Sequence, residues 1–205
     1  RVLTNKCRLS YEHLLKPYAN KPGQEEKYSV TLLIPKEDTV TKADIDQSIQ
    51  AAMQKGVQEA WGGVMPPSLN IPIHDGDGVR QSGEPYGDEC KGHWVMTASS
   101  LQKPEVVDLD IKPIIQPGEV YSGMYARVTV NFFPYNSNGN RGVGCGLDNV
   151  QKIADGEPLS GRKSAAEDFG AAPQQQYASA QQPYPPQQSQ PYSQPQIDPF
   201  TGQPM

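Results

Sequence analysis

The sequence has no run of apolar residues approaching the roughly 18 that a membrane-spanning helix needs, which excludes a helical membrane anchor. Its first residues, 1–6, lack the apolar stretch of a secretory signal. The 3 cysteines are far apart and odd in number, so they do not form a disulfide framework. This pattern fits a reducing compartment, and we expect a cytoplasmic protein without a membrane partner.

Catalytic motifs are also missing. The chain has no P-loop, G-x-S-x-G, H-E-x-x-H or C-x-x-C sequence. The three histidines, His13, His74 and His93, occur in separate segments, and none has a nucleophile beside it in the sequence. We therefore predict that the protein is not an enzyme and requires no cofactor.

Metal ligands are grouped only weakly, in residues 74–93. Asp75 and Asp77 have the spacing of a calcium loop, but the third ligand and the terminal glutamate of such a loop are missing. Cys90 and His93 amount to half of a zinc site. We favour an acidic, glycine-rich surface loop over a metal site.

Positive charge is not in excess either, because the formal net charge is −5. A protein with this charge does not reach nucleic acid through bulk electrostatic attraction. All 18 Lys and Arg lie in residues 1–163, and only three of the 23 acidic residues (Glu167, Asp168 and Asp198) lie beyond them. Any binding of nucleic acid must therefore use local groups of cations within residues 1–163.

The composition changes after Lys163. Residues 164–205 consist mostly of Gln, Pro, Ser, Tyr and Ala, and such a segment buries too little apolar surface to become ordered. We predict a folded domain over residues 1–163 and a disordered, Gln/Pro-rich acidic tail over residues 164–205.

Alternating apolar residues predict strands at 2–9, with Leu3, Cys7 and Leu9 inward, and at 27–34. A loop at 16–24 would join them as a hairpin. Apolar residues at helical spacing predict an amphipathic helix over 41–61, capped by Thr41 and ended by Gly62. A long irregular connection follows at 62–92. Shorter strands are expected at 94–98, 105–108 and 143–147.

The segment 121–135 is the most informative. Its even positions are mostly apolar and suit a core, whereas its odd positions are aromatic, polar or cationic. The pair Asn138-Gly139 predicts a tight turn into a return strand whose glycines leave room for a neighbouring backbone or ligand. The strands and the single helix together predict a mainly β fold, a five- to six-stranded, partly closed antiparallel barrel. A flat sheet with one helix is the alternative.

Aromatic rings on a sheet can stack on nucleobases without regard to base sequence, and cations beside them can contact phosphates. The alternative is that these rings pack against a helix or loop of the same protein. Trp94 shares its face with the apolar Met96 and Ala98 and is expected in the core. The candidate nucleic-acid-binding residues are Lys6, Arg8, Lys27, Tyr121, Tyr125, Arg127, Phe133, Tyr135 and Arg141.

Residues 1–165 resemble a family of tailed-phage proteins associated with single-stranded DNA binding on an OB fold. The resemblance is carried by the ordered segments 27–30, 34–36, 75–77, 120–127, 131–133, 138–152 and 155–159. It implies an OB-fold protein that coats and protects single-stranded DNA during phage DNA replication and recombination in the host cell cytoplasm. The alternative is a phage structural or adaptor protein whose aromatic sheet face contacts another protein.

The tail resembles the Gln/Pro-rich linker and acidic tip of bacterial single-strand-binding proteins. Asp198, Pro199 and Phe200 form an acidic–aromatic tip, although residues 201–205 continue beyond the phenylalanine. The resemblance implies that these three residues dock on phage or host replication and recombination proteins. Self-association is a further interaction that the sequence leaves open.

Overall fold

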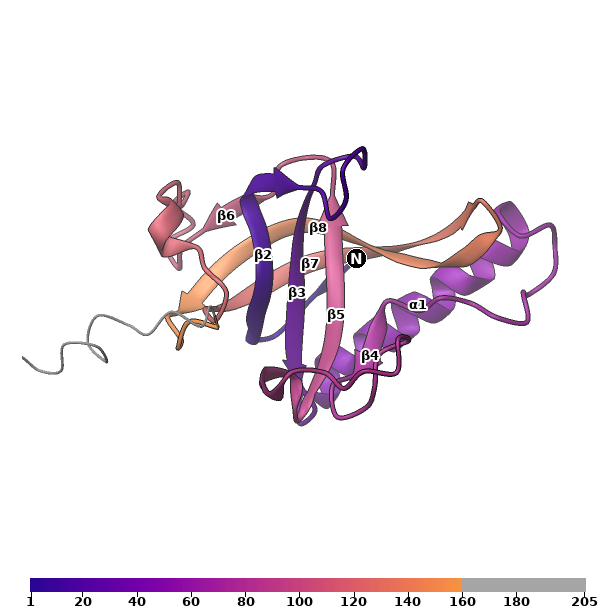
Figure 1. Ribbon diagram of the computed structural model, residues 1–205, viewed down its shortest axis with the longest axis horizontal. Helices are drawn as coiled ribbons and strands as arrows, with labels where there is room; N and C mark the ends of the chain where they lie inside the picture. The colour runs from indigo at the N-terminus through magenta and orange to yellow at the C-terminus, as the bar shows by residue number, and fades with distance from the viewer. Residues whose placement is uncertain (160–205) are drawn as a thin grey trace, which may run out of the picture. The chain divides into compact units, whose positions relative to one another are not determined.

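The computed structural model describes residues 1–159 (Figure 1). The predicted tail, including Asp198, Pro199 and Phe200, lies outside the described residues, and the proposed domain boundary at residue 163 stays a prediction. The elements are β1 (Val2–Leu3), β2 (Cys7–Tyr18), β3 (Lys27–Pro35), α1 (Thr39–Glu59), β4 (Ile73–Asp75), η1 (Asp88–Cys90), β5 (His93–Ser100), β6 (Glu105–Val107), η2 (Pro117–Glu119), β7 (Tyr125–Ser137) and β8 (Asn140–Ala154).

Five strands close into a barrel in the order β7-β2-β3-β5-β8, and pairing of β8 with β7 completes the circle. Four of the junctions are antiparallel, and the junction of β5 with β8 is parallel, at Ser99 and Gly146. This order and this parallel junction define an OB fold, which confirms the predicted fold class. The short strands β1, β4 and β6 extend the barrel sheet. The described residues contain more strands than the sequence predicts, because β1 is separate from β2 and because β4 lies in the predicted irregular connection 62–92.

The predicted alternation of β7 is confirmed. Ala126, Val128 and Val130 are fully buried in the core, whereas Tyr125 and Phe133 on the other face are partly exposed or exposed. The strand begins only at Tyr125, so residues 121–124 lie before it rather than in it. Because the two faces separate cleanly, the outer face of β7 is available for contacts outside the barrel.

The predicted inward position of Leu3 is wrong. Leu3 is 52% exposed, whereas Val2 and Thr4 are buried. The backbone N–H and the side-chain hydroxyl of Thr4 bond to the carbonyl and the N–H of Val128, respectively. Because the Thr4 hydroxyl takes the place of a backbone carbonyl in this pairing, the regular strand is interrupted. The core-facing positions therefore change from Val2 and Thr4 to Cys7 and Leu9.

The helix begins two residues earlier than predicted. Its N-cap is Asp38, whose carboxylate accepts a hydrogen bond from the Thr41 backbone N–H at 3.1 Å. Thr41 is itself buried within the first turn and accepts a bond from the Asn5 backbone. The helix ends at Glu59, and the buried Trp61 lies beyond it and folds back over Gly56.

The predicted turn at Asn138-Gly139 is confirmed, with positive φ angles of 50° and 82°. Strands β7 and β8 continue past the barrel as a two-stranded arm that runs alongside α1 (Figure 1). The indole N–H of Trp61 donates to the Tyr135 carbonyl at 3.0 Å, and Asn136 donates to the Ala60 carbonyl. These bonds attach the arm to the end of the helix.

Two predicted boundaries differ from the structure. Strand β2 continues to Tyr18, which shortens the predicted loop 16–24, and β8 is much longer than the predicted return strand 143–147. Both strands gain length because they pair with long neighbours, a tertiary effect that local turn residues do not encode. Among residues 1–159, none of the helices could serve as a membrane-spanning segment.

Candidate nucleic-acid interface

The outer face of β7 carries four of the predicted contact residues, Tyr125, Arg127, Phe133 and Tyr135. Phe133 is 47% exposed, and Tyr125, Arg127 and Tyr135 are partly exposed. The rings are therefore not sealed beneath other parts of the described chain.

Glycines on β8 explain how the arm presents its rings. Tyr135 pairs with Gly142, and Phe133 pairs with Gly144 across the two strands. A Cβ atom on Gly144 would lie 2.6 Å from Cζ of Phe133, and one on Gly142 would lie 2.9 Å from the Tyr135 hydroxyl. The side chains of β7 thus lie across the neighbouring strand in space that the glycines leave free. The Phe133 ring rests on the sheet with an open side, which suits stacking on a base.

The predicted residues do not form one patch. Tyr125 and Phe133 are eight residues apart on one strand, about 26 Å at the usual rise per residue. Near the start of β7, the Lys6 ammonium lies 5.2 Å from the centre of the Tyr125 ring. At the other end, Phe133 lies on the arm with Tyr135 and Arg141.

Two of the predicted residues are occupied by contacts within the protein. The Arg8 guanidinium donates to the backbone carbonyls of Gly123 and Glu157. The Tyr121 hydroxyl donates to the Asp155 carboxylate and also bonds to Gly156, while its ring packs against the core. These contacts favour structural roles for Arg8 and Tyr121, and their contact with DNA stays a prediction.

A groove on the opposite strands was missed by the sequence reasoning. A hollow of about 530 Å³ lies over the outer face of β2, β3 and β5, and a second hollow of about 390 Å³ follows toward the β2–β3 loop. Thr97 lines both hollows. We call the two together the β3–β5 groove. Its lining includes Ser10, Tyr11, Thr31, His74, Arg80, Tyr86, Val95 and Thr97 in the first hollow, and Tyr18, Lys27, Ser29 and Ser99 in the second.

The floor of the groove is made of small hydroxyl side chains in register. Ser10 pairs with Thr31, and Thr31 pairs with Thr97, so the three form a row across β2, β3 and β5. The hydroxyls of Thr31 and Thr97 are hydrogen-bonded at 3.0 Å. Small side chains keep the floor low, so a flexible chain can approach the sheet.

Aromatic and cationic side chains stand at the edges of the groove. Tyr11 is 63% exposed and has a φ of 46°, at an irregularity where β2 shifts register between Ser10 and His13. The Arg80 guanidinium lies 5.1 Å from the centre of the Tyr86 ring. Lys27, one of the predicted residues, lines the second hollow. Rings and cations beside an open floor are what a single nucleic-acid strand requires.

The sequence reasoning missed Tyr11, Arg80 and Tyr86 because none of them lies in a regularly alternating segment. Arg80 and Tyr86 belong to the connection between β4 and β5, and Tyr11 lies at the irregularity in β2. The signal that could have found them is the expected fold itself, since OB folds bind oligonucleotides on the face of their second and third barrel strands. Those strands are β3 and β5 here.

The loop that carries Asp75 and Asp77 is built around an ion pair. The Lys36 ammonium bonds to both carboxylates and holds the pKa of each below its ordinary value. Among residues 1–159, no group of three or more His, Cys, Asp or Glu side chains is placed to hold a metal ion.

An OB barrel with a lined groove on its β3–β5 face is the architecture of an oligonucleotide-binding domain. Residues 1–179 match the family of the single-stranded-DNA-binding protein of Enterobacter phage Enc34, and the chain belongs to this family. Protein p50 of Acyrthosiphon pisum secondary endosymbiont phage 1 is 30% identical over 171 residues, which cover 78% of this chain and 87% of p50.

Solved structures agree with this assignment. The single-stranded-DNA-binding protein of bacteriophage Enc34 in complex with single-stranded DNA is 29% identical, with a TM-score of 0.65 over 77% of this chain and 88% of that one. The single-stranded-DNA-binding protein gp2.5 of bacteriophage T7 has a TM-score of 0.53, covers 79% of this chain and 96% of gp2.5, and is 16% identical. The likeness to gp2.5 shows a shared fold.

Proposed function

We propose that this protein binds single-stranded DNA without sequence preference and coats exposed strands during phage DNA replication and recombination in the host cell. The β3–β5 groove is the observation that carries the proposal. It combines a low hydroxyl floor with aromatic and cationic edges, on the barrel face that OB folds use for oligonucleotides. Family membership supports the same conclusion.

In this proposal the DNA strand follows the groove, with its bases stacked on Tyr11 and Tyr86 and its phosphates near Arg80 and Lys27. The net charge of −5 repels a DNA strand at long range, so this path depends on the local cations of the groove.

The β7 face is proposed as an additional contact region. Phe133 and Tyr135 on the arm offer rings, with Arg141 on the adjacent strand, and Tyr125 with Lys6 and Arg127 offers a second group. The tail tip at Asp198, Pro199 and Phe200 is proposed to dock on replication and recombination proteins of the phage or host.

Fluorescence polarisation with labelled oligo-dT tests the groove. We expect Tyr86→Ala and Tyr11→Ala each to weaken binding roughly tenfold, because a stacked base contributes about 1–3 kcal/mol. Ile115→Ala is the matched control, since Ile115 is 79% exposed and lines neither hollow. Failure of the wild-type protein to bind oligo-dT at low salt would overturn the function, whereas unchanged affinity of both tyrosine variants would overturn only the groove.

Salt titration separates phosphate contacts from stacking. The logarithm of the affinity for single strands falls with the logarithm of salt concentration by about 0.7 per neutralised phosphate. Lys27→Met should therefore reduce that slope by about 0.7, while Tyr86→Ala should leave the slope unchanged and lower the affinity at every salt concentration.

A further inference from the structure

The connection between β4 and β5 forms a flap over one end of the β3–β5 groove. We define the flap as residues 76–92, which include η1. Three of its side chains, Arg80, Tyr86 and Cys90, line the larger hollow. The position of the flap therefore sets the positions of the Tyr86 ring and the Arg80 guanidinium in the groove.

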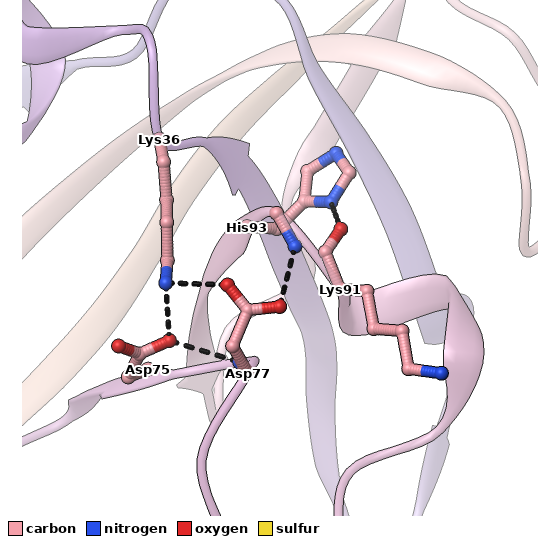
Figure 2. Close-up of polar contacts among 6 residues, drawn as sticks. Lys36, Asp75, Asp77, Lys91 and His93 are labelled. Atoms are coloured by element: carbon pink, nitrogen blue, oxygen red, sulfur yellow. Dashed lines mark hydrogen bonds and ion pairs between the residues drawn. The ribbon is translucent and has the colours of Figure 1, made fainter.

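The base of the flap is fixed by an ion-pair latch, which we define as Lys36 with Asp75 and Asp77. Figure 2 shows the Lys36 ammonium bonded to one oxygen of each carboxylate. The N–O distances are 2.5 Å to Asp75 and 2.6 Å to Asp77. The other oxygen of Asp77 accepts from the backbone N–H of Gly92 at 2.9 Å. The latch thus joins the end of β3 to both ends of the flap.

Backbone packing leaves the base of the flap little freedom. The Gly76 N–H donates to the His93 carbonyl at 2.9 Å, and the Lys36 N–H donates to the Gly92 carbonyl at 3.0 Å. A Cβ atom on Gly76 would lie only 2.1 Å from the Cys90 carbonyl oxygen. The two ends of the flap are therefore in direct contact, and the latch sits at that point of contact.

The far end of the flap is ordered by its own bonds. The backbone N–H of Arg80 donates to the Glu84 carbonyl, and Val79 pairs with Pro85. The Arg80 guanidinium lies over the Tyr86 ring, and that ring packs against the small cluster of Leu33, Cys90 and Val95. Arg80 and Tyr86 therefore contact each other, so a displacement of this part of the flap would move both side chains.

Lys36 itself is poorly suited to contact phosphate. Its single positive charge is bound by two carboxylates, so the latch carries a net negative charge that repels a phosphate. The same ammonium lies 5.2 Å from the centre of the Trp94 ring and is only partly exposed. An effect of Lys36 on DNA binding must pass through the flap.

We propose that Lys36, Asp75 and Asp77 are positioning residues that set the affinity for single-stranded DNA by holding Arg80 and Tyr86 at the groove. This inference rests on the proposed function. None of the three latch residues contacts DNA in the proposal, and the substrate remains a single strand in the β3–β5 groove.

The first test compares Lys36→Met with Lys42→Met in oligo-dT polarisation. Lys42 is the matched control because it also lies over Trp94, at 4.5 Å, but pairs with Asp46 instead of the latch. We expect Lys36→Met to weaken binding roughly two- to fivefold, as befits a partly exposed ion pair, and Lys42→Met to leave it unchanged. Lys36→Arg should restore wild-type affinity, because a guanidinium can bridge two carboxylates.

The second test is a double-mutant cycle, which separates positioning from a general loss of structure. In an Arg80→Ala/Tyr86→Ala background, Lys36→Met should cause no further loss of affinity, since the groups it positions are absent. An equal loss in both backgrounds would overturn the proposal. If Lys36→Met unfolds in urea at a markedly lower midpoint than the wild type, Asp77→Asn replaces it in the cycle. No further loss of affinity in the double-variant background then supports the proposal, and an equal loss in both backgrounds overturns it.

Failure of the wild-type protein to bind oligo-dT would contradict the proposed function. If the wild-type protein binds oligo-dT but the losses caused by Lys36→Met and by Arg80→Ala/Tyr86→Ala are additive, only the positioning role is contradicted.

Discussion

The phenyl ring of Phe133 lies across Gly144, its partner on the neighbouring strand. A methyl carbon on residue 144 would lie 2.6 Å from the ring's Cζ atom, closer than van der Waals contact allows. The exposed Phe133 ring can therefore adopt this orientation only because residue 144 is a glycine. The residue type at position 144 thus affects a ring that we propose to contact DNA.

Replacing this glycine should reduce DNA binding without removing any aromatic group. We expect Gly144→Ala to displace the Phe133 ring and to weaken oligo-dT binding in the same direction as Phe133→Ala, for which we expect a loss of roughly tenfold. Polarisation titrations of both variants check this. Gly118→Ala is the control, because no atom beyond the adjacent residues lies within 4 Å of its added methyl group. If Phe133→Ala binds oligo-dT with wild-type affinity, the arm does not contact the DNA strand.

A second glycine is required by packing within the core. A Cβ atom on Gly56 would lie 2.6–2.7 Å from ring carbons of Trp61, which is 4% exposed. Glycine to alanine in a helix normally gains about 1 kcal/mol. Here we expect a net loss of stability, because overpacking costs about 1–3 kcal/mol. Urea unfolding measures it, with Gln50→Ala at an exposed position of α1 as control. A stabilised Gly56→Ala protein would show that Trp61 moves freely.

A third prediction concerns the pH dependence of stability. Burial raises the pKa of the Glu12 carboxyl above its ordinary value, and the Leu14 backbone N–H only partly offsets this. The folded state therefore binds the Glu12 proton more tightly than the unfolded state, so the stability from this group falls as pH rises through the interval between the two pKa values. Glu12→Gln, a mimic of the protonated carboxyl, should be more stable than the wild type at pH 7.

The difference in unfolding free energy between Glu12→Gln and the wild type should shrink as the pH is lowered toward the ordinary pKa of glutamate. Comparing the two proteins at each pH removes the opposing contribution of the carboxylates whose pKa is lowered, such as Asp75 and Asp155. A difference that does not change with pH would contradict the assignment.

The faces of the strands and the class of fold could be predicted from the amino-acid sequence alone. The alternation of residues 125–135 depends only on the two-residue period of a strand, so the buried positions of Val128 and Val130 follow from it. The Asn138-Gly139 turn is equally local, because both residues adopt positive φ. Several ordered motifs also identified the family that residues 1–179 match.

Which side chains lie together in space depends on tertiary contacts and could not be predicted from the sequence. The register of β2, β3 and β5 assembles the hydroxyl floor, and the flap brings Arg80 and Tyr86 to it from a segment without periodicity. The same structure separates Tyr125 from Phe133 along one strand. The two-residue period of a strand indicates which face a residue occupies, whereas the pairing of strands distant in the sequence determines which residues are its neighbours.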